Sequence, residues 1–363
     1  MQNDYYVFGA HSRGWTMYQY LKTLEPERSI LGFFYDDEED NPEEIDSIKV
    51  YNLKNPEYVF DKNAMVYMAT RGVSHNHIRS VLLSFGFDDQ NIIPVTPKLD
   101  MELRNKYIRR IYEGEGREFL KLEVSDEDES VLCLDASVFV AKTLFDGDFS
   151  EPVALNEYEH IVQAGAAIAD KRIDEAESYD DDGDNISDRN KQFCELTALY
   201  WVWKNAKQDI VGLEHWRRRF ILPSDWVRKM KEEGIDVILP VPLCVMPSLE
   251  ENYKSRHVAT VWDMAMEILE KIHPEDYEAA QCFFRENNLY SPCNMIIAKR
   301  EILSEYCEWL FPVLLRLGDA IGILEDSYQN RYPGFISERL MNYFFEKNRE
   351  RYKIAYADKS FLN

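Results

Sequence analysis

The chain has 363 residues and is strongly acidic, with 66 Asp and Glu residues against 42 Lys and Arg residues and a formal net charge of −24. This charge excludes nucleic acid as an expected partner, because the long-range field repels polyanions. The length predicts two domains, and no apolar run reaches the roughly 20 residues that span a bilayer. The N-terminus shows no signal-peptide pattern, so we expect a cytoplasmic protein.

Strand-like and helical patterns alternate over residues 1–98. The apolar runs lie at 5–8, 30–35, 65–69 and 91–95, and the helical patterns at 15–24 and 75–85. This rhythm predicts a small Rossmann-like parallel sheet as an N-terminal domain. The first turn has the spacing Gly9-x-x-x-x-Gly14, which lacks the middle glycine of the dinucleotide fingerprint. A structural turn is favoured over a phosphate site, and the ligand of this domain is left open.

Residues 99–130 are charged and mostly helical, and we interpret them as a connector. A second α/β domain is expected over residues 131–350, followed by a C-terminal tail at 351–363. Its expected strands lie at 131–134, 209–213, 236–239 and 294–298, and its expected helices at 192–205, 224–233, 258–272, 274–287, 304–316 and 337–348.

The most informative segment is the strand 209–213, which is followed by Glu214, His215, Trp216 and the arginines 217–219. Ligands of open α/β sheets bind at the carboxyl ends of strands, and the planar fork of arginine suits phosphate. If the segment stays extended, Glu214, Trp216 and Arg218 face one way and the alternate residues the other. One set of arginines then faces an anionic ligand while the other pairs with acids.

An acidic loop, residues 180–185, precedes this segment. Its oxygen-rich side chains suit a divalent cation, but the loop does not fit the EF-hand register, so a solvated turn is favoured. Asp184, Asn185 and Arg189 lie in a cap-rich stretch that either satisfies helix-end amides or holds a ribose or sugar hydroxyl. Six scattered cysteines without a C-x-x-C pair argue against a zinc site or a disulfide framework.

Two glutamates stand out against apolar surroundings. Glu195, in the apolar helix at 192–205, needs a partner, and we expect either an ion pair with the arginines 217–219 or a ligand contact. Glu338 follows Ser337, which suits an N-cap, so its carboxylate either favours the helix dipole or acts as a general base. Asp263 and His257 are the rival bases.

The segment from about 164 to 220, with the motifs GDNIS, FCELTALYW and GLEHWRRRF, resembles a family of bacterial capsular and exopolysaccharide glycosyltransferases that is commonly catalogued only as a domain of unknown function. Further matches are DVILP at 236–240, Tyr253 with His257, NMII at 294–297 and GFISERL at 334–340. The resemblance covers roughly residues 131–350 and implies a GT-A-like domain. The family usually opens with a strand followed by a His-Lys pair, whereas this chain has Leu134-Asp135-Ala136 there. The N-terminal unit is similar to the small Rossmann module of sugar-modifying enzymes.

The resemblance implies transfer of a sugar from a nucleotide-diphosphate donor to a glycan or lipid-linked saccharide acceptor of a surface polysaccharide. We expect Arg217, Arg218 and His215 to hold the diphosphate, because no clear Asp-x-Asp ends a strand. Asp184, Asn185 and Arg189 are expected to position the donor, with Glu195, His257 and Asp263 as further substrate contacts and Glu338 as the base.

No metal or other cofactor is expected to be required, and Mn²⁺ or Mg²⁺ stays open as the alternative. The expected location is cytoplasmic, with peripheral association at the inner face of the membrane left open. Two other functions also stay open. One is a non-catalytic sugar-nucleotide-binding or scaffold subunit of a polysaccharide-assembly complex, and the other is a sugar phosphotransferase.

Overall fold

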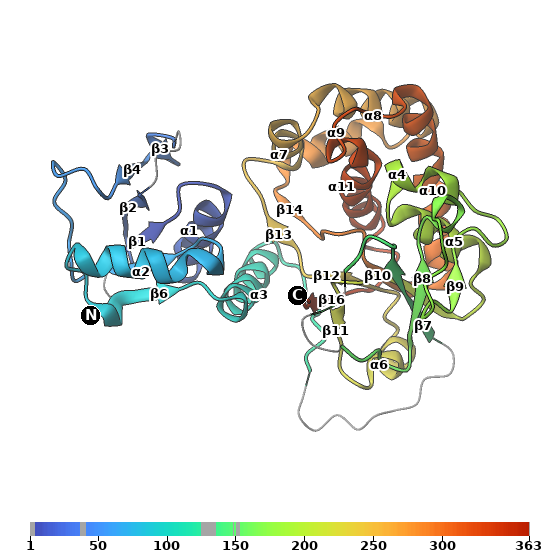
Figure 1. The fold of residues 1–363 in the computed structure, drawn as a ribbon, viewed down its shortest axis with the longest axis horizontal. Helices are drawn as coiled ribbons and strands as arrows, with labels where there is room; N and C mark the ends of the chain where they lie inside the picture. The colour runs from blue at the N-terminus through green and yellow to red at the C-terminus, as the bar shows by residue number, and fades with distance from the viewer. Residues whose placement is uncertain (1–3, 37–40, 125–135, 148, 150–152, 363) are drawn as a thin grey trace. The chain divides into compact units, whose positions relative to one another are not determined.

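The computed structural model describes residues 4–36, 41–124, 136–147, 149 and 153–362. The chain divides into two compact units, residues 1–119 and 120–363 (Figure 1). Each unit has a sheet of its own, so no strand ladder runs from one unit into the other among the described residues. Within these residues, no helix combines the length and the apolar character needed to cross a membrane.

The first unit is built on a sheet with the strand order β3-β4-β2-β1-β5-β6, in which all neighbours except β3 and β4 pair in parallel. Its elements are β1 (Tyr5–Phe8), α1 (Ser12–Leu24), β2 (Ile30–Tyr35), β3 (Glu44–Ile45), β4 (Ile48–Asn52), β5 (Met65–Met68), α2 (His75–Ser84), β6 (Ile92–Pro94) and α3 (Pro97–Gly114). At the first turn, a Cβ on Gly14 would lie 1.9 Å from the carbonyl oxygen of Gly9. The glycine therefore lets α1 begin directly against the end of β1.

Half of the segment predicted as a connector, residues 99–114, belongs to helix α3. The Thr96 hydroxyl caps this helix by accepting from the amide of Leu99 at 3.2 Å. Tyr107 of α3 packs on Tyr20 of α1, with the ring centroids 5.0 Å apart. The helix is thus packed into the first unit. Residues 125–130 of the predicted connector lie outside the described residues.

The second unit contains a mixed sheet with the strand order β11-β16-β12-β15-β10-β7-β8-β9. Its strands are β7 (Ala136–Lys142), β8 (Glu159–Gln163), β9 (Ser178–Tyr179), β10 (Ile210–His215), β11 (Phe220–Ile221), β12 (Val237–Pro240), β15 (Ile296–Lys299) and β16 (Ile354–Lys359), and a separate pair joins β13 (Leu243–Cys244) to β14 (Leu289–Tyr290). The central strands β7, β10, β12 and β15 are almost wholly buried, which explains their continuous apolar runs.

Helices cover both faces of this sheet. They are α4 (Asn190–Phe193), α5 (Leu196–Asn205), α6 (Trp226–Glu232), α7 (Leu249–Arg256), α8 (Ala259–Ile272), α9 (Tyr277–Glu286), α10 (Arg300–Ile321) and α11 (Tyr332–Lys347). Trp226 and Met230 of α6 share a buried cluster with Ile210 and Ile297 of the sheet. Helices α5 and α10 contact β10. Helices α7, α8, α9 and α11 form a second group of helices, which contacts α10 (Figure 1).

The prediction of an α/β fold is confirmed, and the helices expected at 224–233, 258–272 and 274–287 are present with shifted ends. The segment expected as one helix at 192–205 is broken at Cys194, which has a φ of +48°. Residues 354–359, placed by the sequence in a tail, form the strand β16 inside the sheet. The strand expected at 131–134 lies outside the described residues, and β7 begins at Ala136.

Candidate active site

Strand β10 ends in a tight turn from His215 to Arg218. The amide of His215 donates to the carbonyl of Arg218 at 3.0 Å, and the amide of Arg218 donates back at 3.1 Å. The expectation of an extended run through Arg219 is therefore wrong, because the chain reverses here to enter β11. Glu214 and His215 still point to opposite faces of the sheet, as neighbours on a strand must.

The three arginines consequently have different surroundings. Arg219 is buried, with its Nη1 atom 3.1 Å from Glu159 and its Nε atom 3.9 Å from Glu214. Burial, followed by the proximity of Glu159, raises the pKa of Glu214 well above its ordinary value. The Oε2 atom of Glu214 also accepts the amide of Phe220 at 2.9 Å. Arg219 is thus a structural partner of buried acids, as expected for one arginine of the set.

Arg217 and Arg218 lie at the half-buried turn itself. Arg217 donates to the carbonyl of Gly147 at 3.1 Å, and the guanidinium of Arg218 lies 5.3 Å from the ring centroid of Phe361. The C-terminal segment runs beside the turn, with amide hydrogen bonds from Ser360 and Leu362. Strand β16 and its extension therefore position the arginine turn.

A short loop before β15 faces this turn. Asn342 of α11 holds the loop at Ser291, whose amide donates to its Oδ1 atom at 2.7 Å and whose carbonyl accepts from its Nδ2 atom at 3.0 Å. Two successive residues, Cys293 and Asn294, have left-handed backbones with φ of +78° and +50°. Side chains other than glycine adopt this region at a cost, and such residues cluster at functional sites.

Glu338 and His215 both bind the backbone of Cys293. The amide of Cys293 donates to Oε1 of Glu338 at 2.7 Å, and Nε2 of His215 donates to the carbonyl of Cys293. Because a carbonyl can only accept, Nε2 of His215 carries a hydrogen. Arg339 donates to the second oxygen of Glu338 at 2.9 Å. Burial raises the pKa of Glu338, and Arg339 and the Cys293 amide oppose this increase.

The local setting of Glu338 differs from the expectation. Helix α11 begins at Tyr332, so Ser337 is a fully buried interior residue and the N-cap prediction for it is wrong. The segment 331–335 contains the end of a 3-10 turn and the first turn of α11, with Pro333 near the helix start. Glu338 thus lies one turn further into a rigid helix than the sequence indicates.

Glu195 approaches the same loop from the other side. The break at Cys194 places it just before α5, where its Oε1 atom accepts from Nδ2 of Asn294 at 2.8 Å. Its other oxygen lies 3.9 Å from Arg331. The expected pairing with the arginines 217–219 is therefore replaced by Arg331. The same Nδ2 atom donates to the carbonyl of Gly334 at 3.1 Å, and this fixes the orientation of the Asn294 amide.

These contacts define the carboxylate site, which consists of Glu195, His215, Cys293, Asn294 and Glu338. Asn294 is 1% exposed, and its Oδ1 atom is buried without a hydrogen-bond partner among the described residues. Such an orphaned acceptor in a folded protein calls for an explanation, such as a ligand or an ordered water.

The carboxylate site also has a cationic side. Burial raises the pKa of the Cys293 thiol to about 11, Glu338 and Glu195 contribute to the rise, and Lys359 and Arg218 oppose it. The positive charges of Lys359 and Arg218 therefore reach this site, as do the negative charges of the two glutamates. Carboxylates and cations that act at one residue suit a ligand that carries both hydroxyls and an anionic group.

The residues expected to position the donor have other contacts. Tyr200 donates to exposed Asp184 at 3.2 Å, and Asn185 closes the acidic loop by donating to the carbonyls of Asp181 and Gly183. Arg189 donates to Asp319 of α10 at 2.6 Å. The structure therefore gives these three residues roles in the loop and its attachment to α10, and a donor role for them stays a prediction.

The carboxylate oxygens of Asp180, the first residue of the acidic loop, are already bound by protein groups. Asp180 is fully buried and accepts from the amides of Gly165 and Ala166 at 2.8 and 2.9 Å and from two hydroxyls, those of Ser187 and Thr197. These bonds occupy its oxygen atoms, so Asp180 ties the loop to α5.

Elsewhere in the described chain, His273, Glu275 and Asp276 bring metal-ligand atoms within 4.8 Å of one another. Asp276 already accepts a hydrogen bond from Trp309 at 2.8 Å and forms an ion pair with Lys347. Lys347 therefore compensates the charge of Asp276 without a metal ion.

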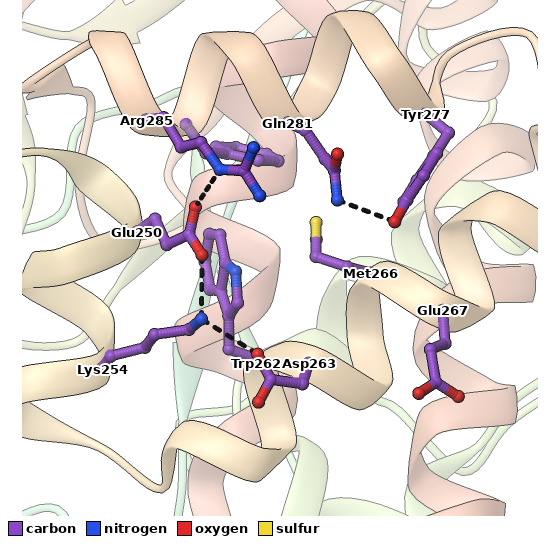
Figure 2. A pocket seen from close by; sticks show the side chains of 10 residues that line it. Glu250, Lys254, Trp262, Asp263, Met266, Glu267, Tyr277, Gln281 and Arg285 are labelled. Atoms are coloured by element: carbon purple, nitrogen blue, oxygen red, sulfur yellow. Dashed lines mark hydrogen bonds and ion pairs between the residues drawn. The ribbon is translucent and has the colours of Figure 1, made fainter.

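The two rival bases, His257 and Asp263, have different surroundings. The His257 ring stacks on Phe335 with centroids 4.0 Å apart, and burial lowers the pKa of His257 to about 4. Asp263 is 58% exposed and pairs with Lys254 at 2.9 Å. It lines a surface pocket of about 230 Å³ between α7, α8 and α9, in which Lys254 also pairs with Glu250 and Glu250 with Arg285 (Figure 2). These pairs join the three helices, and Asp263 belongs to that network.

The sequence did not single out Cys293, Asn294 or Lys359 for the site. One signal was available, since asparagine tolerates the left-handed region better than other side chains and Asn294 stands immediately before an apolar strand.

The architecture of the second unit and the position of its site at strand ends define an α/β domain of the GT-A-like class. The family described as "Domain of unknown function (DUF4422)" matches residues 150–349, more than half of the chain, and the chain belongs to this family.

The chain is also similar to the apo structure of WbbM, a bifunctional glycosyltransferase, with 26% identity and a TM-score of 0.53. The similarity covers 63% of this chain and 45% of that one, so this chain spans less than half of the WbbM structure. A search of curated proteins gives no match.

Proposed function

We propose that this protein is a glycosyltransferase that moves a sugar from a nucleotide-diphosphate donor to a hydroxyl group of a glycan acceptor. The observation that carries the proposal is the placement of Glu338 and His215 on the backbone of one residue, Cys293, next to the arginine turn. The likeness to a bifunctional glycosyltransferase supports the reaction class.

The reaction has two chemical requirements. The acceptor hydroxyl must lose its proton as its oxygen forms a bond to the anomeric carbon of the donor sugar. At the same time the bond from that carbon to the diphosphate oxygen breaks, and its electron pair leaves with the diphosphate. A positioned base meets the first requirement, and fixed positive charge meets the second.

The chain offers groups for both requirements. Glu338 is a half-buried carboxylate whose raised pKa favours accepting a proton. Arg218 and Arg217, with Lys359 nearby, supply charge for the leaving diphosphate, and the hydrogen on Nε2 of His215 keeps that ring bound to the loop. In this proposal the arginines replace a metal ion, so no cofactor is required.

The experiment is a turnover assay on the full chain with a panel of nucleotide sugars. Release of nucleoside diphosphate by the wild-type chain, and its loss in Glu338→Gln, would support the proposal. Glu350→Gln is the matched control, because Glu350 is 90% exposed close to the end of the same helix. If nucleotide sugars stabilise the chain thermally but are never turned over, the protein is a binding subunit. Transfer of a phosphate group instead of a sugar would identify a phosphotransferase.

A further inference from the structure

Three ring side chains form a layered surface at the start of α11. Phe335 stacks on His257 with an interplanar angle of 22°, and the ring of Tyr328 lies 5.2 Å from Phe335 and 5.9 Å from His257. We call these three residues the aromatic platform. Tyr328 is 54% exposed, unlike the two rings beneath it, so the platform presents one large ring to solvent.

Arg331 connects the aromatic platform to the carboxylate site. Its guanidinium carbon lies 6.0 Å from the centroid of Phe335, and its Nη2 atom lies 3.9 Å from Oε2 of Glu195. The Arg331 side chain is 45% exposed and that of Glu195 is 11% exposed. The Arg331 guanidinium therefore lies at the edge of the aromatic platform, and the Glu195 carboxylate lies next to that guanidinium.

The platform carries no charge of its own near neutral pH. Gln329 donates from Nε2 to the carbonyl of Arg256 at 3.1 Å, so its Oε1 atom faces Nδ1 of His257, 3.3 Å away, as an acceptor. The His257 ring is neutral at neutral pH, because burial keeps it from taking a second proton. The surface is thus apolar and uncharged on its ring face, and its edge carries the ion pair of Arg331 with Glu195.

We infer that the aromatic platform is a saccharide-binding subsite, in which the C–H face of a sugar ring stacks on Tyr328 and the ring hydroxyls donate to Glu195. Aromatic rings bind the apolar faces of ligands, and a few placed polar groups fix their orientation. This inference rests on the proposed function and assigns the platform to the acceptor glycan.

The charges decide which part of the reaction the platform serves. At the edge of the platform the charge of Arg331 is offset by Glu195, and the carboxylates of Glu195 and Glu338 repel a diphosphate. The cations Arg218 and Lys359 act at Cys293. An uncharged, hydroxyl-rich ring fits the platform, because carboxylates accept hydrogen bonds from hydroxyls, whereas the donor diphosphate fits the arginine turn.

The test is saturation-transfer NMR on the full chain, with methyl glycosides of glucose, galactose, mannose and N-acetylglucosamine as probes. We expect at least one glycoside to receive saturation on its ring C–H protons. Tyr328→Ala should weaken that binding about tenfold, as expected for the loss of one aromatic contact. Tyr328→Phe keeps the ring and should bind like the wild type. Ile323→Ala is the matched control, because Ile323 is 70% exposed and lies five residues upstream.

Three results would overturn the inference. They are no saturation of any glycoside, equal binding by Tyr328→Ala and the wild type, and displacement of the glycoside by uridine in a Tyr328-dependent manner, which would make the platform a nucleobase site. Donor hydrolysis, measured in the same samples, separates this inference from the proposed function. Hydrolysis without Tyr328-dependent glycoside binding refutes the platform alone, and Tyr328-dependent binding without any donor turnover refutes the transferase alone.

Discussion

His215 and Glu338, which are 123 positions apart in the sequence, are bound to the carbonyl and the amide of the same residue, Cys293. A displacement of that residue would move both side chains, so the strained loop at 293–294 couples the end of β10 to the interior of α11. Asn294 extends the coupling to Glu195 through its amide. The geometry of the carboxylate site therefore depends on one loop more than on any single side chain.

Arg218 and Arg219 provide a test with two adjacent arginines. Arg218→Ala should lower turnover about a hundredfold and leave the fold intact, because one charged donor to a leaving oxyanion contributes roughly 3 kcal/mol. Arg219→Ala should instead destabilise the protein by roughly 3–5 kcal/mol, since it leaves Glu159 and Glu214 buried without their cation. Steady-state kinetics and urea unfolding of both variants give the comparison. Wild-type turnover by Arg218→Ala would contradict the role of the arginine turn.

The pH dependence of turnover follows from the raised pKa of Glu338. A base must be ionised, so activity should fall as the pH decreases through a value above the ordinary 4.5 of glutamate. The free energy of unfolding should change in the opposite direction with pH. A group whose pKa is raised in the folded state stabilises the fold below its unfolded pKa. That contribution is lost as the pH rises through the folded pKa. The measurement is kcat/KM against pH. An acidic limb at or below 4.5 would exclude Glu338 as the base.

The sequence predicts the structure correctly where the local pattern of residues determines it, and incorrectly where contacts between distant parts of the chain determine it. The apolar run of β10 and the charges after it placed a candidate site at a strand end, because periodicity and strand chemistry are local properties. The burial of Arg219 depends on Glu159, which is 60 positions away. Nothing local to Arg219 distinguishes it from Arg218.

The start of α11 and the partner of Glu195 illustrate the same limit. Ser337 has the chemistry of an N-cap, but packing extends the helix to Tyr332 and buries the serine. Glu195 was expected beside the arginines 217–219 or a ligand, yet it meets Arg331 and Asn294 because the helix breaks at Cys194. Tertiary packing overrides local preference at both positions.

Metal removal tests whether the arginine turn replaces a cation. We expect turnover to survive EDTA, because Arg217, Arg218 and Lys359 supply positive charge and Asp180 of the acidic loop is bound to protein amides and hydroxyls. Loss of activity in EDTA, with recovery on adding Mn²⁺ or Mg²⁺, would contradict this and return the diphosphate role to a metal ion. Asp182→Asn is the matched variant, since Asp182 is an exposed acid of that loop and is not among the residues expected to position the donor. Its activity should equal that of the wild type.

Substitutions of Asn294 separate the effect of the loop's backbone conformation from the effect of the side chain. Its φ of +50° suits glycine, and its amide holds both Glu195 and the carbonyl of Gly334. Asn294→Gly therefore loses the hydrogen bonds but removes the left-handed strain of a Cβ atom, whereas Asn294→Ala loses the same bonds and keeps that strain, which costs about 1–2 kcal/mol.

We expect Asn294→Ala to be the less stable variant in urea unfolding by about that amount, and both variants to lose turnover because Glu195 is no longer fixed. Asn294→Asp keeps the shape and tolerates the backbone, but places a second negative charge against Glu195. It should therefore shift the acidic limb of the kcat/KM profile to higher pH, since a nearby like charge raises the pKa of a carboxyl. A profile identical to that of the wild type would show that Asn294 does not act on the carboxylates and that the loop has a packing role alone.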